Sequence, residues 1–207
     1  MKTRNGFVSN SSSSSFIIGL DEKPKHAGKI KVLFLGDRDS VPNEHFYPDW
    51  ADDKTVPSFS VADIANVIFR DLKDAKPLTE EQIIEEINNG WFDESLQELN
   101  DYNTEKDKSW LYEKEYKERT GKDVREDTKS KAYAEWDRLL RKKWDEREKK
   151  HRQMAENFWN KRKKDFEGKQ VFLLSYSDND GDLYATIEHG GILDSNLKIP
   201  CIVVSHH

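Results

Sequence analysis

Cysteine, proline, glycine and long apolar runs are all scarce in this sequence. Its one cysteine, Cys201, excludes a disulfide bond within the chain and favours a reducing compartment. No apolar run approaches the roughly 20 residues that a membrane-spanning helix requires. The first basic residues are followed by serines and not by the apolar stretch of a secretory signal. We therefore expect a cytoplasmic protein that does not bind a membrane.

Apolar side chains are also few, whereas charged side chains are abundant. They make up 35% and 36% of the 207 residues, respectively, and a compact sphere of this length does not need so much charge. The excess favours a shape with much surface for its volume, such as a projecting helical hairpin. Six Trp, seven Tyr and ten Phe supply enough core material to exclude a fully disordered chain.

The charge is divided unevenly along the chain, whose formal net charge is −6. Residues 44–101 contain fifteen acids against four bases, whereas residues 138–164 contain twelve bases against four acids. The negative total argues against a general nucleic-acid-binding protein. The simplest interpretation is that the two regions lie near one another and partly neutralise each other.

Short β-rich segments gather at the two ends of the chain. The expected strands are Phe16–Ile18, Lys29–Leu35, Gln170–Tyr176, Asp182–Glu188 and Ile199–Ser205. The pair Asp180-Gly181 is typical of tight turns and predicts that the third and fourth of these strands form a hairpin. We therefore predict an α+β fold in which residues 1–58 and 168–207 form a small, mainly antiparallel β-sheet.

The middle of the chain, residues 59–167, has the apolar spacing of amphipathic helices and predicts a long, charged helical insertion. Ser60 is expected to cap a helix over 61–74. Residues 79–82 form a capping box for a second helix, which Gly90 ends. Further helices are expected at about 93–101, from Asn103 or Thr104 to Thr120, and from Thr128 or Ser130 to about residue 167.

The last of these helices carries an apolar stripe that is interrupted. Apolar residues recur at three- and four-residue spacing from Tyr133 to Trp144, but Asp145–Gln153 contains none. These turns are either solvated or covered by a partner. A continuous helix over 130–167 would be about 57 Å long, which exceeds the diameter of a compact domain, so it must project, bend or break.

Basic residues of this helix form the first candidate site. They alternate with aromatic residues, an arrangement that suits a phosphate backbone with base stacking. The alternative is a solvated helix whose aromatic residues pack on Trp110, Leu111 and Tyr116 of the preceding helix. The candidate residues are Arg141, Lys142, Lys143, Lys149, Lys150, Arg152, Lys161, Arg162, Lys163 and Lys164.

A run of serines near the N-terminus forms the second candidate site. Its hydroxyl and backbone N–H groups could form a small anion-binding loop, although it lacks the glycines and the lysine of a phosphate loop. The alternative is a simple lead-in to the first strand. The run consists of Ser11, Ser12, Ser13, Ser14 and Ser15.

Acidic and histidine residues near the C-terminus form the third candidate site. An EF-hand is excluded, because its bidentate glutamate would fall on His189. If the last strand runs antiparallel to the second strand of the hairpin, two carboxylates and two imidazoles meet, a set that suits Zn²⁺ or Mn²⁺. These residues are Asp178, Asp180, His206 and His207. The alternative is a turn that needs no ion, in which case we expect no cofactor.

Both chain ends resemble known sequences. Residues 6–16, GFVSNSSSSSF, resemble an N-terminal signature of many uncharacterised small proteins of bacteria and their phages. The segments SYSDNDG (175–181), EHG (188–190) and SHH (205–207) are similar to the tails of some of those proteins. The resemblance covers about a quarter of the chain. It implies that the ends form one module into which variable middle segments are inserted, and that the terminal histidines are native, but it implies no activity.

Three functions follow from these patterns. The leading hypothesis is a non-enzymatic protein-interaction module, an adaptor or inhibitor that presents its charged helices to a host macromolecule. The alternatives are a nucleic-acid-binding protein that uses residues 138–164 and a small metal-dependent or phosphate-handling enzyme centred on the sheet. The long helix also allows a homodimer. Convergence of the serine run and the terminal histidines at one end of the sheet would favour the enzyme.

Overall fold

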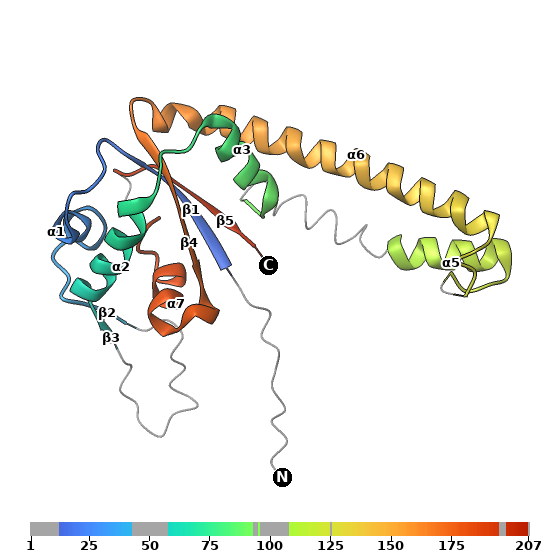
Figure 1. Cartoon of the computed structure of the whole chain (residues 1–207), viewed down its shortest axis with the longest axis horizontal. Coiled ribbons are helices and arrows are strands. Elements are labelled where there is room, and N and C mark those ends of the chain that lie inside the picture. Colours follow the sequence, from blue (N-terminus) through green and yellow to red (C-terminus); the bar gives the residue numbers. More distant parts are fainter. Residues whose placement is uncertain are drawn as a thin grey trace, which may run out of the picture. The chain divides into compact units, whose positions relative to one another are not determined.

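A three-stranded antiparallel sheet built from both ends of the chain forms the centre of the fold (Figure 1). The structure is a computed structural model, which describes residues 13–42, 58–92, 95, 108–124, 126–194 and 198–206. The strands are β1 (Ser13–Leu20), β4 (Gln170–Ser177) and β5 (Cys201–Ser205), in the order β4-β1-β5. The predicted α+β fold with a sheet from both ends is confirmed.

The register gives the sheet two distinct faces. Phe16 lies opposite Leu174 and Val203, whereas Ile17 lies opposite Leu173 and Ile202. Successive side chains of a strand point to opposite faces, so these two rows pack against different layers. β1 is buried along nearly its whole length, as the unbroken apolar run after its serines suggests.

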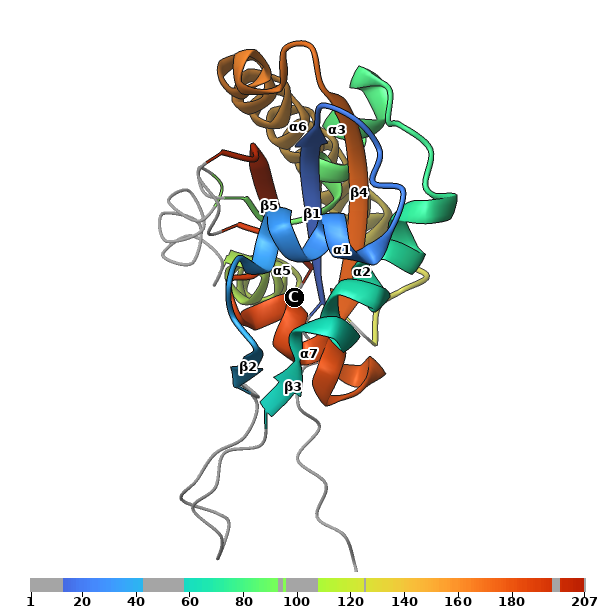
Figure 2. The ribbon, with the colours of Figure 1, turned by 90° about the vertical axis from the view of Figure 1, so that its left-hand side faces the viewer.

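One face of the sheet carries the main hydrophobic core. It is covered by α2 (Val61–Asp74; Figure 2), whose Ile64, Ile68 and Leu72 are fully buried. The single helical turn α1 (Ala27–Ile30), which continues as the π-helix η1 (Lys31–Leu35), packs beside α2. The short helix α7 (Asp182–His189) adds Ile187 to the core.

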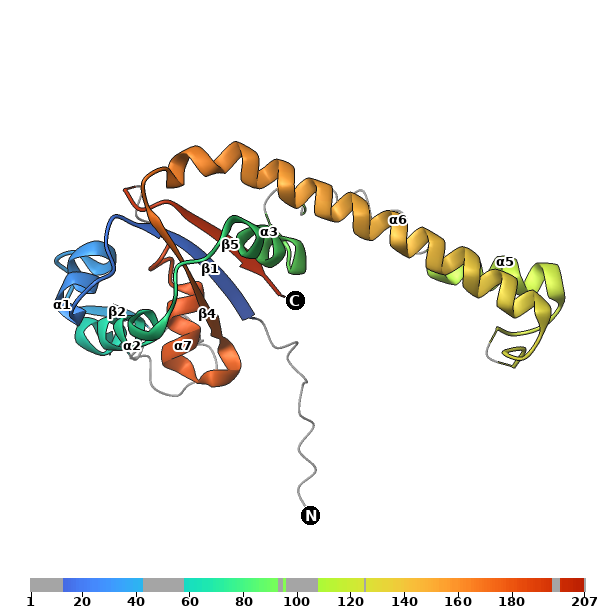
Figure 3. The same ribbon diagram turned by 45° about the horizontal axis from the view of Figure 1, so that its top comes forward.

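The opposite face is covered by α3 (Glu80–Asn89) and the turn after the long helix (Figure 3). Ile83 and Ile87 of α3 are buried. The 3-10 turn η3 (Lys163–Phe166) places Phe166 so close to Gly19 that a Cβ there would be 2.9 Å from its ring. Because both faces are covered, the sheet has no solvated side along β1.

Two of the predicted helix starts are confirmed. The Ser60 side chain accepts a hydrogen bond from the backbone of Asp63, 3.1 Å away, and Thr79 forms the expected capping box with Gln82. The C-terminal end of α2 has a partner that the sequence did not reveal. The ammonium group of Lys23 donates to the carbonyl oxygens of Lys73 and Ala75, where a positive charge suits the helix dipole.

The predicted strand over Lys29–Leu35 is wrong. These residues are helical, and the buried side chains are Ile30, Phe34 and Leu35. Lysine and apolar residues alternate at the start of the segment, which gives it the two-residue period of a β-strand. The four-residue step from Ile30 to Phe34 instead places both side chains on one helical face toward α2. A short two-stranded sheet, β2 (Ser40–Pro42) with β3 (Ser58–Ser60), was not predicted.

The predicted hairpin over 170–188 is also wrong. Its first strand is β4, but Asp182–His189 is helix α7. Gly181 precedes this helix and has φ of 114°. Glycine adopts this positive φ readily, and the chain can therefore turn there from strand to helix. Leu183 and Ile187 are one helical turn apart and both face the core. β4 pairs with β1 instead.

The chain divides into two compact units, Met1–Phe92 with Trp159–His207, and Asp93–Phe158. The sequence placed the boundaries at residues 59 and 167, but α2 and α3 pack on the sheet and belong to its unit. The second unit contains α5 (Lys108–Thr120) and most of α6 (Lys131–Arg162). The helix expected at 93–101 lies outside the described residues except for Ser95. No helix in the described ranges combines the length and apolarity that crossing a membrane requires.

We predict that Gly90→Ala destabilises the sheet unit by about 1–3 kcal/mol. Gly90 has an extended backbone that any residue can adopt, so the cost arises from space alone. A Cβ would lie 2.8 Å from the carbonyl oxygen of Ser205 and 3.0 Å from the ring of His206. Urea denaturation measures the change. Gly28→Ala, in helix α1 beside only a flexible histidine side chain, serves as the control and should be neutral or slightly stabilising.

Candidate functional site

The helical unit contains an aromatic contact between α5 and α6. The ring of Tyr116 in α5 meets that of Trp136 in α6 edge-on, with 5.7 Å between ring centres. Tyr133 lies 5.6 Å from Trp136 on the same helix. The expectation that the aromatic residues of the long helix pack on Tyr116 is confirmed for this pair. The side chains of Trp110 and Leu111 lie outside those that the structure describes.

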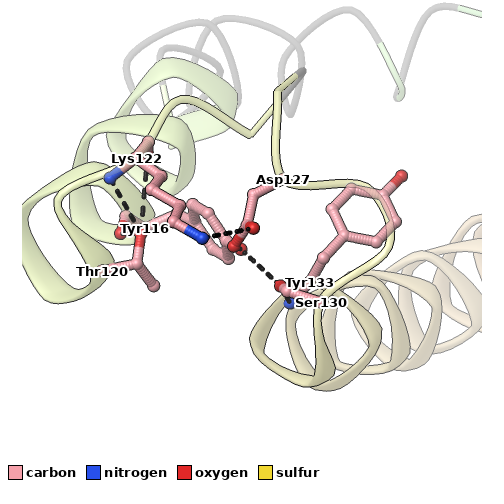
Figure 4. Close-up of polar contacts among 6 residues, drawn as sticks. All are labelled: Tyr116, Thr120, Lys122, Asp127, Ser130 and Tyr133. Carbon is pink, nitrogen blue, oxygen red and sulfur yellow. Dashed lines mark hydrogen bonds and ion pairs between the residues drawn. The ribbon is translucent and has the colours of Figure 1, made fainter.

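A polar cluster joins the two helices where the chain turns (Figure 4). The Tyr116 hydroxyl donates to one carboxylate oxygen of Asp127 at 2.5 Å, and the Lys122 ammonium donates to the other at 3.0 Å. The Ser130 hydroxyl lies 3.3 Å from that of Tyr116 and accepts a hydrogen bond from the Tyr133 backbone. Ser130 therefore caps α6, which was one of the two predicted starts.

This cluster changes the acidity of its members. Hydrogen bonds from Tyr116, Ser130 and Lys122 lower the pKa of Asp127 to about 2, because they stabilise the ionised carboxylate. Burial and the neighbouring carboxylate raise the pKa of Tyr116. The hydrogen bond to Asp127 raises the pKa of Lys122. At neutral pH the cluster is therefore a fixed carboxylate held between a hydroxyl and a cation, which closes the turn.

Next to this cluster lies a mostly apolar groove between α5 and α6. It has a volume of about 190 Å³, and its charged lining residues are Glu115, Arg119 and Lys143. The apolar lining comes chiefly from the side chains of Tyr116, Trp136, Leu139 and Leu140. Small-molecule pockets usually measure about 300–1,000 Å³, so this groove suits a few side chains of a larger partner better than a whole cofactor.

Two large apolar side chains of α6 are in solvent near this groove. Leu139, which lines it, is 51% exposed, and Trp144 is 71% exposed. Trp144 was predicted to belong to the buried stripe, and this part of the prediction is wrong, because Asp145–Lys150 beyond it contains only exposed charged residues. Leu139 was missed, because it lies one position before the regular stripe that contains Leu140.

The predicted basic residues are divided between the two units. In the helical unit, Arg141, Lys142 and Arg152 form ion pairs with acids on the same helix, at 2.8, 3.8 and 3.4 Å. Lys143 lines the groove, and Lys149 and Lys150 are exposed. The last four candidates, Lys161, Arg162, Lys163 and Lys164, belong to the sheet unit. There, Arg162 pairs with Asp165 at 2.9 Å and donates to the Cys201 carbonyl at 3.2 Å.

The serine run and the terminal histidine meet at one end of the sheet. The Ser14 hydroxyl donates to the buried carboxylate of Glu188 at 3.0 Å. On the other face, Ser15 lies 3.0 Å from the Nε2 atom of His206 and 3.0 Å from the hydroxyl of Ser175. Ser13, Ser14 and Ser15 lie in β1 and pair in the sheet, so they do not form the predicted anion-binding loop. Ser11 and Ser12 lie outside the described residues.

The convergence that would favour an enzyme is therefore present, but its geometry is that of a structural contact. Glu86 lies 3.2 Å from the same Nε2 atom of His206 that contacts Ser15, whereas a nucleophilic relay uses the two ring nitrogens for different partners. Ser15 is only 2% exposed, so a substrate does not reach its hydroxyl. Burial raises the pKa of the Cys201 thiol to about 12, which disfavours a reactive thiolate.

The predicted metal-ligand set is not assembled by the residues that the structure describes. Asp178 and Asp180 lie in the turn η4 (Asp178–Asp180), whereas the His206 ring contacts Ser15 and Glu86. Within the described ranges, no group of three or more His, Cys, Asp or Glu side chains is close enough to hold an ion. The prediction assumed an antiparallel neighbour for a strand at 182–188, but that segment is helical. His207 lies outside the described residues.

Comparisons of the chain with known protein families, with curated protein sequences and with solved structures find no match.

We predict that Ser14→Ala destabilises the protein by about 1–3 kcal/mol, because it removes a hydrogen bond from a buried carboxylate. Urea denaturation measures this cost in the wild-type protein and again in the Glu188→Gln background. The cost should be smaller in that background, because the acceptor is no longer charged. Equal costs in both backgrounds would show that the two side chains are not coupled.

We predict that acid removes the stabilising effect of Asp127. Its pKa is lower in the folded protein than its ordinary value of 3.8. Its contribution is therefore complete well above pH 3.8 and is lost as the pH falls toward about 2. In thermal unfolding followed by circular dichroism, Asp127→Asn should lower the melting temperature at about pH 6, and the difference from wild type should shrink toward about pH 2.

The control for this titration is Asp145→Asn, which removes the same charge from an exposed position on α6. Its difference from wild type should remain small across the pH range. A constant effect of Asp127→Asn from neutral to acidic pH would contradict the assignment of the lowered pKa to this cluster.

Proposed function

We propose that this protein is a non-enzymatic protein-interaction module whose helical unit binds a partner protein. The observation that carries the proposal is the exposure of Trp144 and Leu139 in a highly charged helix beside an apolar groove. Three large apolar side chains are exposed among the described residues, and two of them are these neighbours on α6. Apolar side chains gathered in this way are typical of a binding surface.

The energetics support the same conclusion. Burying one large apolar side chain contributes about 1.5–3 kcal/mol, and tryptophan is among the residues that most often dominate binding. Trp144 gains little from folding, because 71% of it stays in solvent. The largest free-energy gain that remains for this side chain is therefore burial against another molecule.

The charges of α6 favour a protein over nucleic acid as the partner. Asp137, Glu146 and Glu156 form ion pairs with basic residues of the same helix, which weakens the field that a phosphate backbone would meet. Glu115 also lines the groove. The apolar lining has no counterpart in a polyphosphate chain, whereas the side chains of a protein segment would fill it.

The proposal is tested by selecting binders from a displayed library of random peptides against the immobilised full-length protein. Each enriched peptide is then measured by fluorescence anisotropy against wild type and against the double variant Leu139→Ser, Trp144→Ser. We expect the double variant to weaken binding at least about thirtyfold, equivalent to about 2 kcal/mol. Circular dichroism should show unchanged helix content, because both side chains are exposed.

The matched control is Val32→Ser, which removes the third exposed apolar side chain, 72% exposed, from the sheet unit. It should leave the affinity within about twofold of wild type. If all enriched peptides bind the double variant as tightly as wild type, the helical unit does not carry the binding surface.

A further inference from the structure

The strand β4 forms one edge of the three-stranded sheet (Figure 2), and half of its backbone groups point away from β1. The carbonyl oxygen of Val171 accepts a hydrogen bond from the N–H of Leu78, 2.8 Å away, so Val171 directs its backbone outward. Because the direction of hydrogen bonding alternates along a strand, Leu173 and Ser175 also direct their N–H and C=O groups outward. We call the segment from Leu173 to Ser175 the β4 edge.

The part of the chain that the structure describes leaves the β4 edge uncovered. Residues 75–79, which link α2 to α3, reach the strand only near its start, through the hydrogen bond of Leu78 with Val171. Among the described residues, no hydrogen bond reaches the outward backbone groups of Leu173 or Ser175. The side chains on the α3 face follow the same trend, because Val171 is buried, Leu173 half-buried and Ser175 exposed. The cover over β4 therefore ends before Ser175.

The opposite edge of the sheet is protected. On β5, the backbone of Ser205 exchanges hydrogen bonds with that of Trp91 at 2.7 and 2.8 Å, and the Arg162 guanidinium donates to the carbonyl oxygen of Cys201 at 3.2 Å. β4 has eight residues without a charge or a proline, and it pairs with β1 residue by residue, without a bulge. Charges, prolines and bulges are the usual features that keep sheet edges from pairing. The β4 edge can therefore accept another strand.

We propose that β4 pairs with β4 of a second copy of the chain, antiparallel about a two-fold axis, so that the two sheets join into one. This inference goes beyond the proposed function, because it concerns the sheet unit and not the helical unit. The axis passes beside Leu174. Leu173 of each copy then lies opposite Ser175 of the other, and both pairs exchange N–H···O=C hydrogen bonds.

The β4 edge is complementary to its own copy. A two-fold axis makes the two strands antiparallel and brings the same surface of each copy together, and outward N–H groups of one strand then meet outward C=O groups of the other. Like charges placed opposite one another would destabilise such a pair, but Gln170–Ser177 contains no charge. The register also leaves the contact of Leu78 with Val171 in place, because it uses only Leu173 and Ser175.

A strand of another protein is a weaker match. It could form the same backbone hydrogen bonds, but β4 has no charged side chain that would select its sequence. A second copy always carries the matching edge. Because small interfaces associate weakly, we expect a reversible dimer with a dissociation constant of about 10–100 µM.

Sedimentation velocity of the full-length protein at about 1–500 µM measures this association. We expect Ser175→Lys to raise the dissociation constant at least about tenfold, because the two introduced ammonium groups lie on a diagonal of about 7–8 Å across the axis. The matched control is Ser175→Ala. It removes the same contact with the Ser15 hydroxyl but adds no charge, so its dissociation constant should stay within about twofold of wild type.

A pair of opposite charges separates repulsion across the axis from damage to the fold. Ser175→Glu should weaken the dimer by itself, as Ser175→Lys does. An equimolar mixture of the two variants should form a heterodimer about as stable as the wild-type dimer, because the charges on the diagonal now attract. Labelling one variant with a fluorophore allows sedimentation to detect the heterodimer.

Three other outcomes would overturn the inference. The first is a wild-type protein that stays monomeric over this range, or a dimer that Ser175→Lys leaves intact. The second is a dimer lost in the Leu139→Ser, Trp144→Ser variant, which would assign self-association to the helical unit. The third is a selected peptide whose binding is lost in Ser175→Lys but kept in that double variant, which would assign the β4 edge to a strand of another protein.

Discussion

The pairing of β1 with two strands from the far end of the chain is the constraint on which the rest of the fold depends. Ser13–Leu20 lies between Gln170–Ser177 and Cys201–Ser205, with both pairings antiparallel. Bringing such distant segments together costs loop-closure entropy. Burial of both sheet faces offsets this cost, because α2 covers one face and α3 the other. The two helices therefore belong to the sheet unit, although they were expected to form part of the insertion.

The sequence predicted elements where local chemistry and spacing agreed. Ser60 and the Thr79–Gln82 capping box mark helix starts through side chains that satisfy backbone groups within one turn. The prediction failed for Lys29–Leu35 and for residues 182–188, because a segment of seven residues can fit both a two-residue and a four-residue period. The first segment packs against α2 and the second against β4. This packing decided each conformation, and it cannot be inferred from the residues of the segment alone.

The candidate site was only partly predictable for a similar reason. The apolar spacing from Tyr133 to Leu140 predicted the contact of Tyr116 with Trp136. This spacing does not indicate which residues of α6 the preceding helix covers. Trp144 was consequently placed in the buried stripe, and Leu139 was overlooked. The Tyr116–Asp127–Lys122 cluster was also missed, because its residues are separated by a loop without a recognisable motif.

Among the described residues, the two units differ in how completely they bury their own side chains, and this difference supports the proposal of a binding surface in the helical unit. In the sheet unit, Ser14, Ser15 and His206 find partners within the fold. In the helical unit, the polar cluster around Asp127 and the contact of Tyr116 with Trp136 join α5 to α6, and an apolar groove lies beside them. Surface that a fold does not bury itself contributes free energy only when another molecule covers it. The proposal that the helical unit binds a partner therefore depends on apolar surface, that of Leu139 and Trp144, which the folded chain leaves in solvent.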